Sequence, residues 1–557
     1  MFHTTRHFSV PALLAILLAT QASAQDISGI AEQQLLLQQQ REEARRRQDE
    51  AQPDVRLQDK AAPLAGYPAS ESPCFVIRTI ALEGEDARAF DWALDAADDA
   101  RGRCLGTAGI NVLVGKIQNA LIARGYVTSR VVAAPQDLQG GHLRLVLVPG
   151  RIRAVQFAGA RPGHWEAALP TGAGRLLNLR DIEQGLENLK RVPGAQADIQ
   201  IVPAELPGAS DLMVQWQGGR NYRFSLSADD SGSDATGAYQ GGVTLSVDNP
   251  TGFQDLFYVT VNRNLPGGGG SGPHGTRGYA AHYSVPWHYW LLTAQVNDYR
   301  YHQRVAGALQ DYVYSGNSKS TEIKAARLVY RDAVRKTTLS LRAYGRRSQN
   351  FIDDTEVEVQ RRRTGGFVLG LGHREFIGQA TLDASLAWKI GTGHFGAIPA
   401  PEELYGEGTA RPRILNADLS LQLPLTPTLA WSSAWRGQWN RTPLVVQDQF
   451  AIGGRYTVRG FDGESSLSAE RGSLLRNDLS WSIPGSTYQL YLALDVGRVS
   501  GPSAARLRGD RLSGGAVGWR FAWGRLQGDV FAGAPIHRPE GFQTARIATG
   551  FNLNYEY

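Results

Sequence analysis

Residues 490–497 read LYLALDVG, and this stretch alternates strictly between two kinds of side chain. Successive side chains in a strand point to opposite faces, so Leu490, Leu492 and Leu494 share one face. The opposite face carries Tyr491, Ala493, Asp495 and Gly497. The pattern predicts a β-strand with one apolar face and one polar or small face.

The same alternation recurs through residues 220–557, for example at 222–227, 243–248, 419–423 and 479–483. At about 21 residues per strand with its connection, this segment suits about sixteen antiparallel strands. A soluble sandwich would pack the apolar face on a second sheet, whereas an outer-membrane barrel would turn it to lipid. Alternation alone does not separate these two folds.

Composition narrows the class of protein. The chain has 557 residues, 63 of them glycine, a formal net charge of +5 and 42% hydrophobic residues. A mean hydropathy of −0.28 argues against a bundle of membrane helices, and the apolar content is too high for a disordered chain. The small net positive charge, spread over the whole chain, does not indicate a nucleic-acid-binding protein. A β-barrel remains possible because it hides its apolar residues at alternate positions.

The N-terminus predicts export. Residues 1–24 contain Arg6, an apolar run at 10–19, and a small-residue cleavage site that ends at Ala24, so Gln25 begins the predicted mature chain. The alternative, a membrane anchor, needs about 18 or more apolar residues. A signal peptide without a helical anchor favours the barrel over the sandwich, and the segment 220–557 is too long for one ordinary sandwich.

Residues 25–50 are rich in helix formers and predict a single polar helix with little apolar surface. Residues 51–73 contain four prolines among alanine, glycine and polar residues, which predicts an extended, mobile linker. The helix is therefore expected to be tethered rather than docked.

Two small α+β modules follow, at 74–150 and 151–219. The first runs from a strand-like segment at 74–84 through helical segments at 90–100 and 110–121 to strands at 127–134 and 141–150. The second is a shorter version, with a helix from about Asn178. The repeated β-α-α-β-β order predicts two copies of one module.

Cys74 and Cys104 are the only two cysteines. Export would allow a disulfide between them, which would close a loop of about 30 residues and contribute about 3–4 kcal/mol in the chain-entropy model. Two free buried thiols are the alternative. The pair lacks the spacing of a metal site.

The sequence resembles a known family over nearly the whole predicted mature chain. The Gln-rich helix, the linker, CLGTAGINVL, NALIARGYVTSRVV, LVPGRI and NLRDIEQGLENLKRVPGAQADIQIVPAE are similar to two-partner secretion transporters of the ShlB/FhaC/HecB haemolysin secretion/activation type. The modules at 74–150 and 151–219 resemble polypeptide-transport-associated (POTRA) domains. QQLLLQQQREE and the cysteine-containing first module lean toward the contact-dependent-inhibition (CdiB-like) branch. The expected fold is mainly β: an N-terminal plug helix, two POTRA domains and a transmembrane barrel at 220–557.

The resemblance also implies site residues. Val458, Arg459, Gly460 and Phe461 resemble the tip of a loop, near 450–470, that folds back into the barrel lumen, where family knowledge pairs the arginine with an aspartate on the inner wall. The candidate wall residues are Asp495 and Gly497. An ionised Asp495 facing lipid would be costly, which also favours the inward orientation. The alternative is that Arg459 makes only a weak surface contact.

The chain stops within an alternating strand that carries Phe551, Leu553, Tyr555 and Tyr557. A terminal aromatic residue on such a strand resembles the assembly signal of bacterial outer-membrane barrels. The expected location is the outer membrane, with the POTRA domains in the periplasm. The expected surroundings are outer-membrane lipid or lipopolysaccharide and the barrel-assembly machinery. Arg361, Arg362 and Arg363 could bind lipopolysaccharide phosphates, but a solvated strand end is the simpler interpretation.

The implied function is passive export of one large unfolded exoprotein, of haemolysin, adhesin or contact-dependent toxin type, through a pore. No phosphate-binding, GxSxG or HExxH motif occurs, so we expect no enzyme, catalytic residue, cofactor or metal, and no nucleic-acid partner. A membrane-protein assembly factor of the BamA/TamA type is the nearest alternative function. A lipid hydrolase of the outer membrane is a more remote one.

Overall fold

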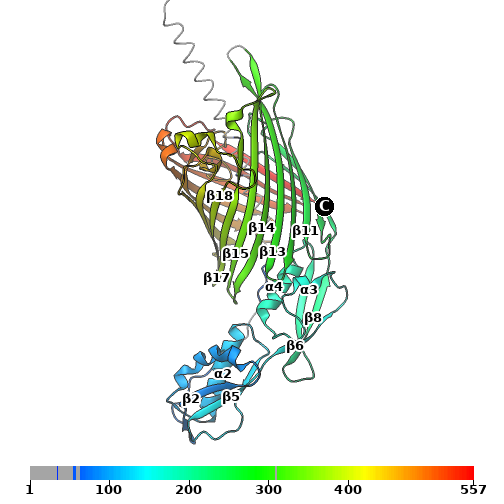
Figure 1. Cartoon of the computed structure of the whole chain (residues 1–557), viewed down its shortest axis with the longest axis vertical. Helices are drawn as coiled ribbons and strands as arrows, with labels where there is room; N and C mark the ends of the chain where they lie inside the picture. Colours follow the sequence, from blue (N-terminus) through cyan, green and yellow to red (C-terminus); the bar gives the residue numbers. More distant parts are fainter. Residues whose placement is uncertain (1–33, 35–39, 41–53, 58–62, 308–309) are drawn as a thin grey trace, which may run out of the picture.

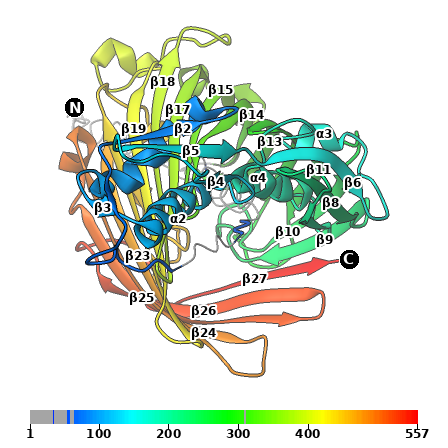
Figure 2. The same ribbon diagram turned by 90° about the horizontal axis from the view of Figure 1, so that it is seen from below.

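The computed structural model describes the chain except for residues 1–33, 35–39, 41–53, 58–62 and 308–309. A large closed barrel stands above two small domains that follow one another below it (Figure 1). Seen from below, the small domains lie across the mouth of the barrel (Figure 2). The predicted signal peptide, with Ala24 and Gln25, lies outside the described residues.

The first small domain is built on a mixed three-stranded sheet in the order β2-β5-β4. Its elements are β1 (Phe75–Val76), β2 (Thr79–Glu83), the 3-10 helix η1 (Ala87–Ala100), β3 (Cys104–Leu105), α2 (Thr107–Ala123), β4 (Arg130–Val132) and β5 (His142–Val148). On α2, Leu113, Ile117 and Leu121 recur every four residues and are fully buried against the sheet. The predicted module at 74–150 therefore has its core beneath this helix.

The strand predicted at 74–84 is divided into β1 and β2. The chain changes partners at Ile77 and Arg78, whose N–H groups donate to the carbonyls of Arg103 and Gly141. As a result, β1 pairs with β3 and β2 pairs with β5. The Cys74–Cys104 disulfide, with a Cα–Cα distance of 5.2 Å, closes the β1-β3 end of the domain.

The second small domain repeats the plan in reduced form. It contains β6 (Arg151–Phe157), α3 (Trp165–Ala168), α4 (Leu179–Leu189), β7 (Gln196–Pro203) and β8 (Ala209–Gln217), with strand order β6-β8-β7. The Asn178 side chain accepts a hydrogen bond from the Arg180 N–H at 2.8 Å and so caps α4, where the sequence places the start of the helix. Ile182, Leu186 and Leu189 bury one face of α4 against the sheet.

The barrel consists of sixteen long antiparallel strands, as predicted. They are β9 (Tyr222–Asp229), β10 (Gln240–Asp248), β11 (Leu256–Asn264), β12 (Gly275–Trp287), β13 (Trp290–Ala306), β14 (Asp311–Arg331), β15 (Arg335–Ile352), β17 (Arg362–Ile377), β18 (Ala380–Thr392), β19 (Arg413–Pro424), β20 (Leu429–Asn440), β23 (Arg471–Ser482), β24 (Gln489–Ser500), β25 (Arg511–Trp523), β26 (Leu526–His537) and β27 (Ala548–Glu556). The two-residue β16 (Thr355–Glu356) and the 3-10 helix η2 (Glu358–Gln360) lie in the loop between β15 and β17. The 3-10 helices η3 (Pro401–Tyr405), η4 (Val446–Asp448) and η5 (Pro502–Arg506) lie in other loops. β27 pairs with β9 and closes the barrel.

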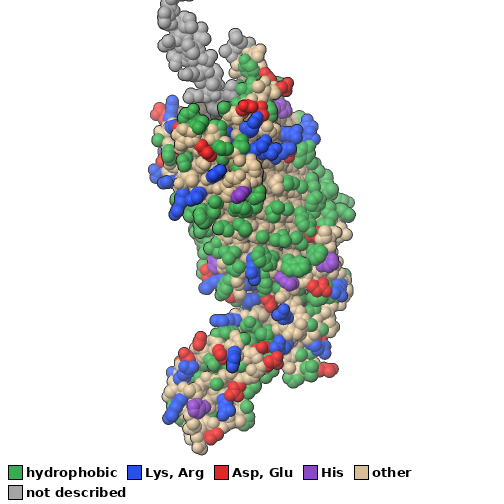
Figure 3. All heavy atoms as spheres, in the orientation of Figure 1, with side chains coloured by type: hydrophobic (Ala, Val, Ile, Leu, Met, Phe, Trp, Pro, Cys, Tyr) green, Lys and Arg blue, Asp and Glu red, His purple; other side chains and the backbone are tan. Residues whose placement is uncertain are grey.

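The alternation at 490–497 corresponds to two environments in β24. Leu490, Leu492 and Leu494 are 41–52% exposed on the outer surface, whereas Tyr491, Ala493 and Asp495 are at most 5% exposed. On the face shown in Figure 3, hydrophobic side chains form a broad band across the barrel, and charged side chains gather at its ends. Short turns face the small domains and longer loops lie at the far end, as in outer-membrane barrels. Among the described residues, none of the helices has the length and apolar character needed to cross a membrane.

The expectation of an undocked linker is wrong for its described residues, 54–57 and 63–73. Glu71 accepts hydrogen bonds from the N–H groups of Gly106, Ala108 and Gly109 at the start of α2. Val55 and Leu57 pack on the core of the second domain. The prolines keep the segment extended, but its polar and apolar groups find partners on both domains. Of the predicted helix at 25–50, only Gln34 and Gln40 are described, both in helical conformation.

Candidate functional site

A hairpin loop fills part of the barrel lumen. It is built on β21 (Phe450–Ile452) and β22 (Leu467–Ala469), which pair with each other and not with the barrel sheet. Their apolar side chains form a buried cluster with wall residues of β23, β24 and β25, namely Leu474, Val499 and Leu512. A loop with its own apolar core against the wall is held as a folded element rather than as a random chain.

The tip of this loop places Arg459 against Asp495 of β24. The guanidinium Nε and Nη2 donate to the two carboxylate oxygens at 2.7 Å each, and the Arg459 backbone N–H donates to Oδ2 at 2.9 Å. Arg459 is 4% exposed and the Asp495 side chain is fully buried. A bidentate arginine–carboxylate pair has fixed geometry as well as charge, so it specifies one position of the loop. The structure thus brings together the two residues that the sequence singled out.

Two wall residues near this pair were missed by the sequence analysis. Asp478 of β23 forms an ion pair with Arg459 at 2.5 Å, and Arg476 lies 3.7 Å from Asp495. The outward Leu479 and Trp481 put Ser480 on the inner face, so extending the alternation by two and four residues would have placed Asp478 and Arg476 there as well. The site is a charge cluster of Arg459, Arg476, Asp478 and Asp495, and Arg520 of β25 lies 3.5 Å from Asp478 at its edge.

Glycines occupy the positions where the loop and the barrel wall come closest. Gly460 has φ +95°, and a Cβ there would lie 2.4 Å from the Ala534 carbonyl oxygen. On the wall, a Cβ at Gly514 would lie 2.1 Å from the Arg459 carbonyl oxygen, and a Cβ at Gly497 would lie 2.9 Å from Ile452. Gly533 faces Gly460 in the same way. The loop backbone therefore lies in contact with β25 and β26, and its side chains pack on Gly497 of β24, which only glycine permits at these positions.

The remaining tip residues are buried in the same place. Val458 is fully buried and Phe461 is 2% exposed, with its ring edge-to-face on Phe542 at 5.7 Å. Asp462 accepts a hydrogen bond from the Ala545 N–H at 2.6 Å. The tip thus also contacts the loop between β26 and β27.

The far side of the hairpin meets the loop between β9 and β10. Glu464 accepts a hydrogen bond from the Asp234 N–H at 2.9 Å, and Arg455 pairs with Asp230 at 2.7 Å. Burial is the main cause that raises the pKa of Glu464 to about 7; the hydrogen bond from the Asp234 N–H lowers it, and the charges of Asp234 and Asp462 raise it. This carboxyl therefore changes its charge near neutral pH.

The lumen retains a polar cavity of about 1030 Å³ between the small domains and the hairpin loop. Its lining includes Gln184 and Glu187 of α4 at one end and Arg459, Arg476 and Asp478 at the other. Gln40 also lines it, and the buried Gln34 donates to the Ser233 hydroxyl at 2.8 Å. The described residues of the N-terminal segment therefore lie along the same passage.

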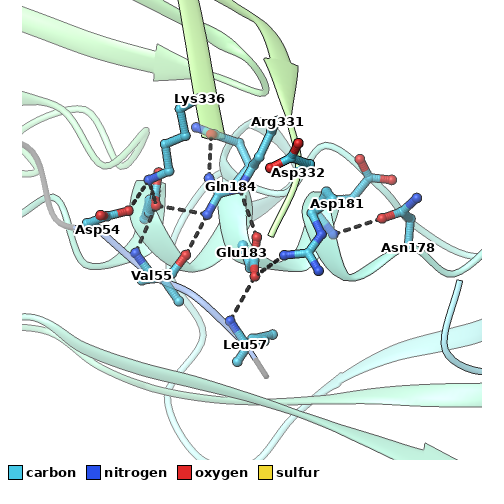
Figure 4. Close-up of polar contacts among 12 residues, drawn as sticks. Asp54, Val55, Leu57, Asn178, Asp181, Glu183, Gln184, Arg331, Asp332 and Lys336 are labelled. Carbon is cyan, nitrogen blue, oxygen red and sulfur yellow. Dashed lines mark hydrogen bonds and ion pairs between the residues drawn. The ribbon is translucent and has the colours of Figure 1, made fainter. Parts of the chain in front are cut away.

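A second charge cluster joins the second small domain to the barrel (Figure 4). Arg331, at the end of β14, is 3% exposed and pairs with Glu183 at 2.9 Å and Glu187 at 3.0 Å, both on α4. Lys336 of β15 also pairs with Glu187. Tyr289 donates to Asp181, and Asn188 donates to the His288 carbonyl at 2.8 Å. Because α4 is both the core helix of its domain and the docking helix, its two faces couple that domain to the barrel turns.

The linker residues 54–57 complete this junction. The N–H groups of Val55 and Leu57 donate to Glu187 at 2.9 Å and Glu183 at 2.8 Å, and the Val55 carbonyl accepts from Arg331 at 2.5 Å. On the other side, Asp54 pairs with Lys336, and the Arg56 guanidinium lies 3.7 Å from the ring centre of Phe376. No sequence motif marks this junction, because it combines residues from three distant segments.

The C-terminal strand residues lie at the seam that closes the barrel. β27 pairs with β9 over five residue pairs, from Asn552↔Asp229 to Glu556↔Ser225. Tyr555 and Tyr557 are 38% and 60% exposed, while Phe551 and Leu553 are half-buried. The Phe551 N–H donates to the Asp230 side chain at 2.9 Å rather than to β9. The described residues contain no group of three or more metal-ligating side chains.

The fold and this lumen define a class of protein: an outer-membrane β-barrel transporter with POTRA domains in the periplasm. The family model for haemolysin secretion/activation protein ShlB/FhaC/HecB matches residues 208–521, and two POTRA-domain models match 75–150 and 151–203. The chain belongs to this ShlB/FhaC/HecB family. It is therefore an outer-membrane transporter of the two-partner secretion type.

Named relatives and solved structures agree with this assignment. The chain is 35% identical over 516 residues to the outer membrane transporter CdiB-2 of Burkholderia pseudomallei, with 88% of each chain covered. It is 22% identical to the haemolysin transporter protein HpmB of Proteus mirabilis, over 85% of this chain and 83% of the relative. The structure of CdiB from Acinetobacter baumannii superposes with a TM-score of 0.83 at 31% identity, covering 95% of this chain and 99% of that one.

Proposed function

We propose that this chain captures one large unfolded exoprotein in the periplasm and conducts it through the barrel to the cell surface. The observation that carries the proposal is a polar lumen obstructed by a separately folded loop, whose tip is held by Arg459 and Asp495. A passage for an extended polypeptide must be polar and must be cleared of such an obstruction. The relatives named CdiB and HpmB are transporters in the same family, which supports a toxin or haemolysin type of cargo.

Capture by strand addition suits the open edges of the two POTRA sheets. Among the described strands, β7 pairs only with β8 and β4 pairs only with β5, so both are edge strands. The outer edge of β7 is the more open one, because the Val131 N–H of β4 already donates to the Gln118 side chain at 3.2 Å. Val202 on β7 is 41% exposed, and Val132 on β4 is 47% exposed. An extended segment added to such an edge is held mainly by main-chain hydrogen bonds, which suits an unfolded cargo of variable sequence.

Release of the obstruction is the conducting step. We expect the loop tip to leave Asp495, and the helix at 25–50 to leave the lumen, before the chain passes. Folding of the cargo outside then prevents its return, so transport requires no nucleotide and no cofactor, and we propose no enzymatic activity. The terminal strand with Phe551, Leu553, Tyr555 and Tyr557 is proposed to be read by the barrel-assembly machinery, and the outer apolar band to contact lipid and lipopolysaccharide.

The test is export of the partner exoprotein by cells that lack this chain. With extracellular proteolysis blocked, deletion should abolish the exoprotein outside the cell, and plasmid-borne wild type should restore it. Undiminished export without the chain would overturn the proposal. A photocrosslinking residue at Val202 should capture the cargo, whereas one at Asp98, on η1 and away from the sheet edge, should not.

A further inference from the structure

The junction of α4 with the barrel has the construction of a peptide-binding groove. One wall is α4 with Glu183 and Glu187, and the other is the turn between β14 and β15 with Arg331 and Lys336. The linker segment 54–57 lies between these walls, and Figure 4 shows Asp54, Val55 and Leu57 beside Glu183, Arg331 and Lys336. The segment is a ligand that the chain supplies from its own sequence.

Most of the contacts to this segment are made to its main chain. Two N–H groups, of Val55 and Leu57, and one carbonyl, of Val55, take part in hydrogen bonds with buried charged side chains. Any extended peptide offers the same groups at the same spacing. The groove therefore recognises an extended backbone more than one particular sequence.

The side chains of the segment alternate between the two walls. Val55 and Leu57 pack on the core of the second POTRA domain. Asp54 and Arg56 face the barrel, where they meet Lys336 and Phe376. The groove thus selects apolar residues at positions i and i+2 of an extended chain, which is the pattern of a strand-forming segment.

An empty groove would be costly. Glu183 is fully buried, and without Leu57 its Oε1 loses a donor, while Arg331 loses the Val55 carbonyl. Buried charged groups that lose partners destabilise a protein far more than an exchange of partners does. Replacement of one extended peptide by another is therefore easier than simple release of the linker.

We propose that this groove is a second binding site for an extended, strand-forming polypeptide with apolar residues at i and i+2, and that the exported chain exchanges there with linker residues 54–57. The inference rests on the proposed export function. The linker joins the groove to the N-terminal segment, whose Gln34 and Gln40 lie in the lumen region. Occupation of the groove by cargo would free residues 54–57 from their partners on α4 and on the barrel.

The test measures binding of a fluorescent peptide of residues 51–60 to the full-length transporter in lipid nanodiscs. The double variant Val55→Ser/Leu57→Ser loosens the internal ligand and should bind the peptide at least tenfold more tightly than wild type. The matched control peptide exchanges Val55 and Arg56, which keeps composition and charge but destroys the i, i+2 spacing, and it should bind at least tenfold more weakly. A photocrosslinking residue at the Leu57 position of the peptide should map to residues 179–189.

Two results would overturn the proposal. One is equal binding of the two peptides to the double variant. The other is peptide binding that the unfolded N-terminal part of the exported protein fails to displace, which would make the groove a site for the linker alone. Heat-modifiable migration of the double variant checks that its barrel is folded. If wild type still exports the exoprotein in either case, the proposed export function holds and only the proposed binding site in the groove is wrong.

Discussion

The lumenal loop and the POTRA–barrel junction each bury one arginine between two carboxylates. They differ in which segments supply the other hydrogen-bond partners. Arg459 is 4% exposed between Asp495 and Asp478, and Arg331 is 3% exposed between Glu183 and Glu187. In the loop, the partners of Arg459 are all on the barrel wall. At the junction, the main chain of a third segment supplies the remaining hydrogen bonds.

This difference indicates which part of the molecule can move alone. The loop can leave the wall as one folded hairpin, and the carboxylates that it leaves behind face a polar lumen where water can reach them. At the junction, separation of α4 from the barrel also strips Val55 and Leu57 of their partners. We therefore regard the loop as the movable part and the junction as the rigid part, unless another peptide replaces the linker.

The largest effect is expected from Arg331→Ala. It removes one of the two arginines that pair with the fully buried Glu183, leaving Arg180 at 2.6 Å, and one of the two cations on Glu187. The loss of these buried hydrogen-bonded pairs should cost about 2–5 kcal/mol of docking free energy. Hydrogen exchange should then rise across residues 179–189 and 54–57. Arg335→Ala is the matched control, because its pair with Glu375 is half-exposed and worth about 0–1 kcal/mol. Equal exchange in the two variants would contradict the rigidity assigned to the junction.

Arg459→Ala should have the next largest effect. The variant loses the bidentate pair with Asp495, so the loop should undock by about 2–4 kcal/mol while the barrel still assembles. We expect export of the exoprotein to fall at least tenfold, measured in culture supernatant, with a normal heat-modifiable barrel band. The control is Arg498→Ala. Arg498 lies on β24, as Asp495 does, but its pair with Asp510 is exposed, so this variant should export normally. Wild-type export by Arg459→Ala would remove the role proposed for the tip.

Gly514→Ala tests the close approach without touching a charge. Its Cβ would lie 2.1 Å from the Arg459 carbonyl oxygen, so the loop must shift, at a cost of about 1–3 kcal/mol. Gly515→Ala, one residue along β25, meets nothing closer than 3.4 Å and should be silent. Hydrogen exchange of residues 453–466 should rise in the first variant only. An equal rise in hydrogen exchange in both variants would show that the wall glycines are needed for the strand itself and not for docking of the loop.

The smallest effect concerns pH. The pKa of Glu464 is raised from 4.5 to about 7 in the docked loop, so docking gains a contribution that is fully present below about pH 4.5 and is lost as pH rises through 7. Between pH 5.5 and 8 the loop should loosen by about 1–2 kcal/mol, seen as faster exchange after correction for intrinsic rates. Glu464→Gln should flatten this dependence.

Local patterns were sufficient to predict much of the molecule. The strict alternation at 490–497 placed Asp495 opposite the outward leucines, and the helical spacing of Leu113, Ile117 and Leu121 placed the core face of α2. The tip motif at 458–461 was identified through its resemblance to the family, which needs only residues that are adjacent in the chain. Asp478 was missed although the same alternation, carried further along β23, would have placed it on the inner face.

The sequence by itself determined most helical and alternating segments and the two modules, because side-chain periodicity is a local property of the chain. The choice of a barrel over a sandwich came from the predicted signal peptide, the length of 220–557 and the family resemblance. Only the tertiary structure decided that residues 54–57 dock between α4 and the β14–β15 turn, where a proline-containing segment had predicted a mobile linker. It alone also decided which glycines, Gly514 and Gly533, must lie against Gly460 and Arg459. The physical reason is that a buried charge or a close backbone contact needs a partner, and that partner can lie more than a hundred residues away in the chain. A local sequence pattern does not indicate which distant residue it is.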